Sequence, residues 1–169
     1  MDDVLVSFSI PGRLRGKGRH RSRLVKARDG RQFVHNHPDK KTEDAEAMVR
    51  SFASDAMDGR PPFDGPLVLQ VSVRMNTTAS WSKKKRAETV YITGKPDIDN
   101  QIKLIGDACN GILWKDDSQL CAIHFGRKYD DSHGERVDII VRTPVTQAVT
   151  ERQPAAEQRP IPLFAEARR

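Results

Sequence analysis

The chain is poor in cysteine and in aromatic residues, and it has no long apolar run. Its two cysteines, Cys109 and Cys121, lie in apolar patterns, which favours buried free thiols over a disulfide or a zinc site. No stretch approaches the roughly 18 apolar residues that a membrane span needs, and the first residues form neither a basic leader nor a cleavage site. We therefore expect a cytoplasmic protein without a membrane-spanning segment.

Glycine-rich phosphate loops are missing as well. Neither GxGxxG nor GxxxxGK followed by Ser or Thr occurs, and GRLRGKGR at residues 12–19 lacks both the spacing and a following apolar helix. We therefore expect no nucleotide cofactor. Aromatic residues make up 6% of the chain and charged residues 31%, which indicates a small core under a highly charged surface. Dimerisation would help to bury the apolar surface that one copy leaves exposed.

Positive charge predominates in the sequence. Lys and Arg number 29 against 23 Asp and Glu, and the sequence pI is about 9.5, which is typical of a protein that binds polyphosphates. Against this background, aspartates are concentrated in one short segment, here called the acidic motif. It covers residues 95–119, KPDIDNQIKLIGDACNGILWKDDSQ. The simplest explanation is a divalent metal ion held against a phosphate backbone.

The acidic motif contains a helix signal. Pro96 favours a helix that begins at about Asp97 to Asp99. Apolar residues then recur at helical spacing on one face, and charged residues recur on a neighbouring face, where Lys103 lies beside the carboxylates. The apolar set is Ile98, Ile102, Ile105 and Cys109, and the charged set is Asp99, Lys103 and Asp107.

We expect the chain to fold back after Trp114 so that Asp117 meets Asp97 and Asp99. Any one of these aspartates could instead be a helix cap or a turn residue. Three like charges at one point, however, repel one another unless a cation neutralises them. Mg²⁺ suits such a place, because it prefers a few carboxylates together with waters and phosphate oxygens.

The combined pattern resembles the RusA-type Holliday junction resolvases, small homodimeric endonucleases often carried by phages and prophages. The resemblance rests on KPDIDN at 95–100, Lys103, DACNGILW at 107–114 and DDSQ at 116–119, with SWSKKKR at 80–86. It places the family's essential acidic residues at Asp97, Asp99 and Asp117 and its essential lysine at Lys103.

The resemblance implies a Mg²⁺-dependent endodeoxyribonuclease that resolves Holliday junctions or other branched DNA in recombination and repair. Asp97, Asp99 and Asp117 would coordinate Mg²⁺, for which Mn²⁺ could substitute, and Lys103 would stabilise the attacked phosphate or orient the attacking water. Asn100 and Asp116 would support these ligands or form turns. A homodimer would present two symmetric sites to the two equivalent strands of a four-way junction.

Two other functions remain open. In the first, the protein binds branched DNA without cutting it, and the aspartates only cap and position a helix. In the second, it is an active nuclease that acts mainly on flaps or replication forks, because a metal site of this kind cuts any phosphodiester. In every case we expect Asp107 to be structural, paired with Lys103 four residues before it.

Basic segments flank the acidic motif and are candidate DNA contacts. Residues 12–31 contain nine Lys or Arg residues with interspersed glycines, which predicts a mobile loop, with a hairpin around Asp29 and Gly30. The loop could also be merely solvated, and the basic run that follows Trp81 could be an exposed helical turn. The predicted DNA-backbone contacts are Arg13, Arg15, Lys17, Arg19, Arg21, Arg23, Lys83, Lys84, Lys85 and Arg86.

The hydrophobic pattern predicts an α+β fold. Helical periodicity covers residues 42–57, and alternating apolar residues predict strands at 4–10, 67–75, 119–128 and 137–141. Together with the helix of the acidic motif, these elements form a small mixed sheet of four or five strands with two main helices. We expect one RusA-like domain at residues 1–143, followed by a flexible C-terminal tail at 144–169.

Overall fold

The computed structural model describes residues 3–18, 21–26, 29–37, 39–88 and 90–145, and only the backbone of residues 21–25 and 33–37. The elements are β1 (Val4–Pro11), β2 (Arg21–Lys26), β3 (Gln32–His37), α1 (Lys40–Met57), β4 (Leu67–Met75), α2 (Lys83–Ala87), α3 (Ile98–Cys109), a 3₁₀ turn (Asp117–Gln119), β5 (Leu120–Tyr129) and β6 (Arg136–Arg142). From residue 146 onward, the predicted tail lies outside the described residues. Within the described residues, no helix is long and apolar enough to cross a membrane.

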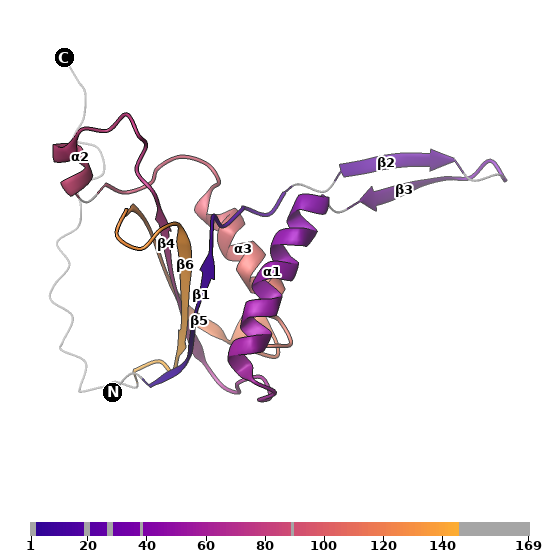
Figure 1. Cartoon of the computed structure of the whole chain (residues 1–169). Coiled ribbons are helices and arrows are strands. Elements are labelled where there is room, and N and C mark those ends of the chain that lie inside the picture. Colours follow the sequence, from indigo (N-terminus) through magenta and orange to yellow (C-terminus); the bar gives the residue numbers. More distant parts are fainter. Residues whose placement is uncertain (1–2, 19–20, 27–28, 38, 89, 146–169) are drawn as a thin grey trace, which may run out of the picture.

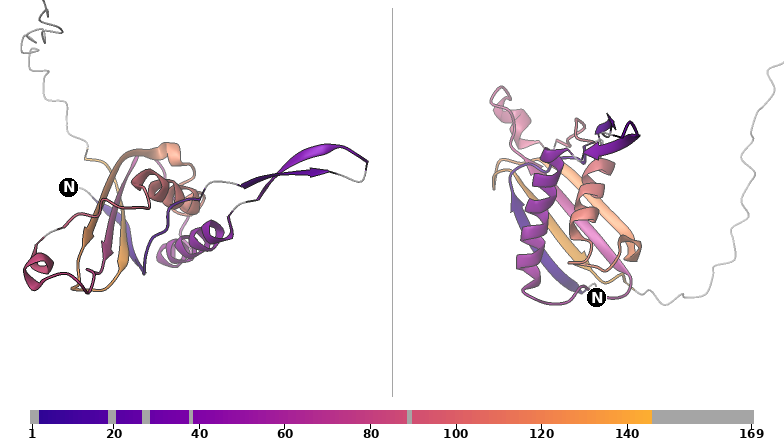
Figure 2. Two further views of the ribbon diagram at one scale, coloured as in Figure 1. Left: turned by 90° about the horizontal axis from the view of Figure 1, so that it is seen from above. Right: turned by 90° about the vertical axis from the view of Figure 1, so that its right-hand side faces the viewer.

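A mixed four-stranded sheet in the order β1-β6-β4-β5 forms the body of the molecule. Strand β6 pairs antiparallel with β1 and β4, whereas β4 pairs parallel with β5. Buried and half-buried residues alternate along β4 because successive side chains of a strand point to opposite faces. Helices α1 and α3 cover one face of the sheet (Figure 2). The predicted α+β fold with two main helices is therefore confirmed.

The buried face of α3 differs from the predicted one. Leu104, Ile105, Ala108 and Cys109 are buried, whereas Ile98 is 40% exposed. The polar Gln101 is almost fully buried on the same side of the helix, where its amide has hydrogen-bond partners. The buried side of α3 is therefore rotated relative to the predicted side. Gln101 is buried there because its amide is hydrogen-bonded, whereas the apolar pattern predicts Ile98 on the buried side.

The two cysteines have different environments. Cys109 is buried in α3, and burial raises the pKa of its thiol to about 12. Cys121 is exposed on β5, and its thiol donates a hydrogen bond to the carbonyl oxygen of Leu67. The prediction of two buried thiols is thus wrong for Cys121, because β5 lies at the edge of the sheet.

A separate two-stranded hairpin, here called the arm, projects from the body (Figures 1 and 2). Strands β2 and β3 form it by antiparallel pairing from Arg21 with His37 to Lys26 with Gln32. At its tip, Gly30 has a φ of 85°, a left-handed conformation that glycine adopts without steric cost. The predicted hairpin around Asp29 and Gly30 is present, and much of the expected loop is β-structure.

Candidate functional site

Asp97 and Asp99 lie at the N-terminal end of α3, and both are exposed. Asp97 is the N-cap residue, yet its side chain makes no capping hydrogen bond, although its backbone oxygen accepts from the N–H of Gln101. The first helical turn therefore leaves the Asp97 carboxylate available for another partner. This observation favours the ligand interpretation of Asp97 over the cap interpretation.

Lys103 is exposed on α3, one helical turn beyond Asp99. It shares the helix side of Asp99, as the spacing predicted. The half-buried Asn100 accepts a backbone hydrogen bond from the N–H of Lys17 at 2.9 Å. Asn100 thus ties the segment before the arm to the first turn of α3.

A buried polar network supports the Lys95-Pro96 peptide that precedes Asp97. The Gln101 amide nitrogen donates to the carbonyl oxygen of Leu14 at 2.9 Å, and the Arg127 guanidinium donates to the Gln101 amide oxygen at 3.2 Å. The same guanidinium nitrogen donates to the carbonyl oxygen of Pro96. Gln101 is 2% exposed and Arg127 9%, so the network lies beneath the candidate site.

Gly16 fits tightly against this peptide. A Cβ atom at Gly16 would lie 2.8 Å from the Cβ of Pro96 and 3.1 Å from the Cβ of Asn100, distances too short for carbon atoms. The absence of a side chain at Gly16 therefore allows the chain to pass directly beside the start of α3. Sequence reasoning missed Gln101 and Arg127, and it treated Gly16 only as a loop residue.

Asp116 and Asp117 have different roles in the turn before β5. The Asp116 carboxylate accepts hydrogen bonds from Ser118, which hold the pKa of that carboxyl below its usual range. Gln119 completes the capping box and also donates to the carbonyl oxygens of Phe63 and Gly65. Asp116 thus forms the turn, whereas Asp117 is exposed at its first helical position.

Asp117 does not meet Asp97 and Asp99 within one chain. The hydrogen bond from Arg127 holds Pro96 near the C-terminal part of β5, whereas Asp117 lies just before this strand begins. A strand advances by about 23 Å from Leu120 to Arg127. Within the described ranges, no three acidic, His or Cys residues lie close enough to hold a metal ion. The expected meeting is therefore wrong for a single chain, because α3 separates the two ends.

Several predicted DNA contacts have structural partners. Lys17 bridges α1 and α3, with its ammonium 3.2 Å from Glu46 and in contact with Asp107. Asp107 thus pairs with Lys17 rather than with Lys103, because the chain before the arm passes alongside α3. Arg13 donates from Nε to both carboxylate oxygens of Glu135 at 2.8 and 2.9 Å.

The basic run of α2 is also partly structural. Arg86 donates to the carbonyl oxygens of Thr78, Ala79 and Trp81, and the Lys85 ammonium lies 4.1 Å from the centre of the Trp81 ring. Lys83, Lys84 and Arg15 are exposed. Arg21 and Arg23 lie on β2 of the arm, and Arg19 lies outside the described residues. The DNA contacts remain a prediction, for which the exposed cations and the arm are the better candidates.

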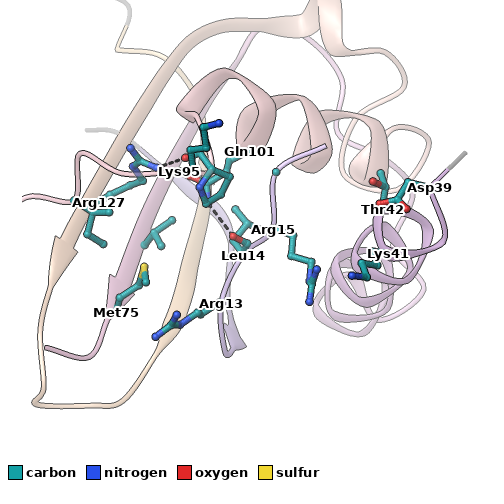
Figure 3. Close-up of a pocket in the computed structure, with 14 residues that line it drawn as sticks. Arg13, Leu14, Arg15, Asp39, Lys41, Thr42, Met75, Lys95, Gln101 and Arg127 are labelled. Atoms are coloured by element: carbon teal, nitrogen blue, oxygen red, sulfur yellow. Dashed lines mark hydrogen bonds between the residues drawn. The ribbon is translucent and has the colours of Figure 1, made fainter. Parts of the chain in front are cut away.

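A cavity of about 490 Å³ opens beside the Lys95-Pro96 peptide (Figure 3). Lys95 and Arg127 lie on one side, and Asp39, Lys41 and Thr42 at the start of α1 lie on the other. Five cations, Arg13, Arg15, Lys41, Lys95 and Arg127, and one carboxylate, that of Asp39, line this cavity.

Most of this chain is similar in sequence to known proteins. The family model described as "Endodeoxyribonuclease RusA" matches residues 11–142. One similar protein is the uncharacterized protein YqaN of Bacillus subtilis (strain 168), which is 30% identical over 145 residues. That similarity covers 81% of this chain and 95% of the relative.

Proposed function

The chain belongs to the RusA family of endodeoxyribonucleases, and from this premise we propose that it is a Mg²⁺-dependent nuclease that resolves four-way junctions in recombination and repair. The observation that carries the proposal is the start of α3. There, two exposed carboxylates, one of them a helix cap residue without a capping bond, lie within two helical turns of an exposed lysine. The family match indicates the reaction, which is cleavage of a DNA phosphodiester. The carboxylates and the lysine at the start of α3 support this region as the proposed site.

The proposed roles follow from the chemistry of the side chains. The carboxylate oxygens of Asp97, Asp99 and Asp117 are hard ligands of the kind that Mg²⁺ prefers, and they would hold the ion. When bound, the metal lowers the pKa of its water and neutralises charge on the attacked phosphate. Lys103 would place its ammonium against a phosphate oxygen, where charge develops during cleavage. Asp116 would keep the turn that presents Asp117.

A homodimer accounts for the distance between Asp117 and the other two aspartates. Strand β5 is an edge strand, and the segment before α3 covers only its end, where Ile92 donates to Arg127 and Tyr129 donates to Val90. Residues 120–126 thus form an open edge in the described sheet, on which Ile123 is 41% exposed.

Antiparallel pairing of two β5 edges about a twofold axis would place opposite ends of the two strands side by side. The Asp117 end of each chain would then lie next to the Arg127 end of the other, where Pro96 and α3 begin. Each proposed site would combine Asp97 and Asp99 of one chain with the Asp117 of its partner. This arrangement gives two equivalent sites, as symmetric cleavage of a junction requires.

The arm is the proposed grip on the DNA. It extends beyond the compact body and carries Arg21 and Arg23 on β2, with Lys26 exposed near its tip. A basic two-stranded ribbon of this kind can follow a phosphate backbone without reading bases. Arg15, Lys83 and Lys84 are exposed on the body and would add to this contact.

Cleavage assays on matched substrates test the proposal. Purified protein is incubated with labelled four-way, forked, flapped and linear DNA of shared sequence, with Mg²⁺, with Mn²⁺ or with chelator. We expect metal-dependent paired cuts on the four-way junction and much slower cutting of linear DNA. Preferential cutting of flaps or forks would replace the junction as the substrate.

A DNA-binding protein without nuclease activity is the second candidate. It is favoured by the separation of Asp117 from the two helical aspartates in a single chain. Tight junction binding without cleavage at any tested metal concentration would support this function and overturn the nuclease proposal.

A further inference from the structure

The cavity beside the Lys95-Pro96 peptide is large enough for a small organic group. Its volume of about 490 Å³ lies within the range of roughly 300–1,000 Å³ found for small-molecule pockets. Its walls come from the segment after β1, the start of α1, the ends of β4 and β5 and the segment before α3. Any occupant would therefore lie immediately beside Asp97.

The rim of the cavity is strongly basic. Arg13, Arg15, Lys41, Lys95 and Arg127 line it, against the single carboxylate of Asp39. Arg13 is already neutralised by Glu135, but three exposed cations, Arg15, Lys41 and Lys95, remain around the opening. Arg127 lies deeper in the wall. Such a concentration of positive charge favours an anion, and a phosphate is the anion that the proposed substrate would bring.

Arg127 provides independent support for an anion at this place. Arg127 is only 9% exposed, and its guanidinium donates hydrogen bonds to two neutral oxygens, those of Pro96 and Gln101. Its Nε atom is buried and has no hydrogen-bond partner among the described residues. A buried guanidinium without a counterion is costly, and an anionic group within reach would remove part of that cost.

The floor of the cavity is apolar. Leu14, Val73 and Ile92 are buried there, and Met75 lines it beside them. A phosphate alone gains nothing from such a surface, whereas a nucleobase does, because its flat face buries well against aliphatic and thioether groups. The combination of basic rim and apolar floor matches one nucleotide, with its phosphate outside and its base inside.

On the basis of the proposed nuclease function, we propose that this cavity holds one unstacked nucleotide of the cut strand, next to the phosphodiester at Asp97 and Asp99. The rim cations bind the flanking phosphate, and Leu14, Val73 and Met75 receive the base. Unstacking a base is least costly where the duplex is already interrupted. The cavity would thus favour branch points over continuous duplex, which links the pocket to substrate choice.

A fluorescent base tests the cavity without cleavage. 2-Aminopurine, whose emission rises when it leaves the stack, is placed singly at each position around the branch point of a four-way junction. The wild-type protein is added in chelator, so that the strands stay intact. We expect a several-fold rise in emission at one position per cut strand and little change elsewhere. No rise at any position, with the junction fully bound, would overturn the proposal and leave only phosphate contacts.

Variants then locate the unstacked base. Met75→Trp fills the floor and keeps every cation, so it should abolish most of the rise in emission. Tyr91→Trp is the matched control, because Tyr91 is 70% exposed and does not line this cavity. Arg127→Met should lower both emission and junction affinity. If Met75→Trp retains the full rise, the base unstacks elsewhere and the proposal fails, whether or not Arg127→Met folds.

The outcomes separate this inference from the proposed function. A wild-type protein that cuts junctions but never raises the emission refutes the cavity and leaves the nuclease. A protein that raises the emission in a Met75-dependent way but never cuts, with any metal, refutes the nuclease and leaves the nucleotide site.

Discussion

Lys103 is the residue for which binding and chemistry are most easily separated. It is exposed on α3, so its replacement removes charge without disturbing the core. We predict that Lys103→Ala lowers the cleavage rate more than tenfold, because a cation placed against a reacting phosphate acts mainly in the transition state. Junction affinity should fall much less. Single-turnover cleavage and equilibrium binding on the same junction give the two values.

The control for Lys103 is Lys115→Ala, which removes another exposed lysine, one paired with Asp64. This control should leave the cleavage rate close to that of the wild type. An equal loss of rate and affinity in Lys103→Ala would make Lys103 an ordinary phosphate contact.

Gly16 shows how a residue remote in sequence can position the site. We predict that Gly16→Ala displaces Pro96 and lowers stability by about 1–3 kcal/mol, since the new methyl group would overlap the Pro96 ring. The shift should also slow cleavage through Asp97. Denaturant unfolding and cleavage rates measure both effects.

Gly94→Ala is the matched control for Gly16→Ala. Gly94 lies in the same segment before α3, yet a Cβ atom there meets nothing within 4 Å and its φ is not in the left-handed region. This variant should keep wild-type stability and activity. If Gly16→Ala behaves like Gly94→Ala, the tight contact with Pro96 does not position the site.

Some site residues could be predicted from sequence and others could not. Asp97, Asp99 and Lys103 follow from one local helix signal, and the structure places all three on the first turns of α3. Gln101 and Arg127 act through contacts that are distant in sequence, such as Gln101 with Leu14. A glutamine within an apolar helical pattern was the available signal, but its partner could not be read from spacing.

At the scale of elements, the arm carries a prediction about DNA affinity. We predict that replacing Arg19, Arg21 and Arg23 together by Ala weakens binding to junctions of unrelated sequence by similar factors. The slope of log affinity against log salt should flatten, because each phosphate neutralised contributes about 0.9 to that slope. Among the described strands, β2 and β3 pair with each other and not with the body, so folding of the body should be unaffected.

Salt titrations test that prediction. They compare the wild type, the arm variant and the double variant Lys83→Ala/Lys84→Ala. The second variant removes two exposed cations from α2 and serves as the comparison. An unchanged slope in the arm variant, with a flatter slope in the α2 variant, would move the main DNA contact to α2.

Hydrophobic periodicity predicts some features of the elements and misses others. Strands β4 and β6 alternate cleanly, and the structure has them close to their predicted positions. The buried face of α3 is rotated from the predicted face, because hydrogen bonds of its side-chain amide allow Gln101 to occupy a core position. The position of β5 at the edge, which exposes Cys121, depends on strand order and is not encoded in local pattern.

For the whole molecule, mixed dimers test whether each site is shared between chains. We predict that Asp97→Asn and Asp117→Asn proteins are each inactive, whereas a mixed dimer of the two cuts one strand of a junction. In that dimer one site carries both substitutions and the other carries neither. Differently tagged chains, purified through both tags, and nicking of a labelled junction provide the measurement.

A mixed dimer of Asp97→Asn and Asp99→Asn is the matched control. Both substitutions lie on the same side of the shared site, so each of its two sites keeps one defect and no activity should return. Failure of the first mixture to nick DNA would assign all three aspartates to a single chain, and α3 would then have to move for them to meet.

In the proposed dimer, the segment that covers the end of β5 would also limit how many copies can associate. Hydrogen bonds from Ile92 to Arg127 and from Tyr129 to Val90 leave a short open edge at residues 120–126. When two such edges pair antiparallel, each satisfies the other completely, and this edge offers no place for a third chain. We predict a single dimeric species in sedimentation velocity over a wide range of protein concentrations. A growing series of larger particles would mean that β1, the other edge of the sheet, also recruits chains, and that the assembly is open-ended rather than closed.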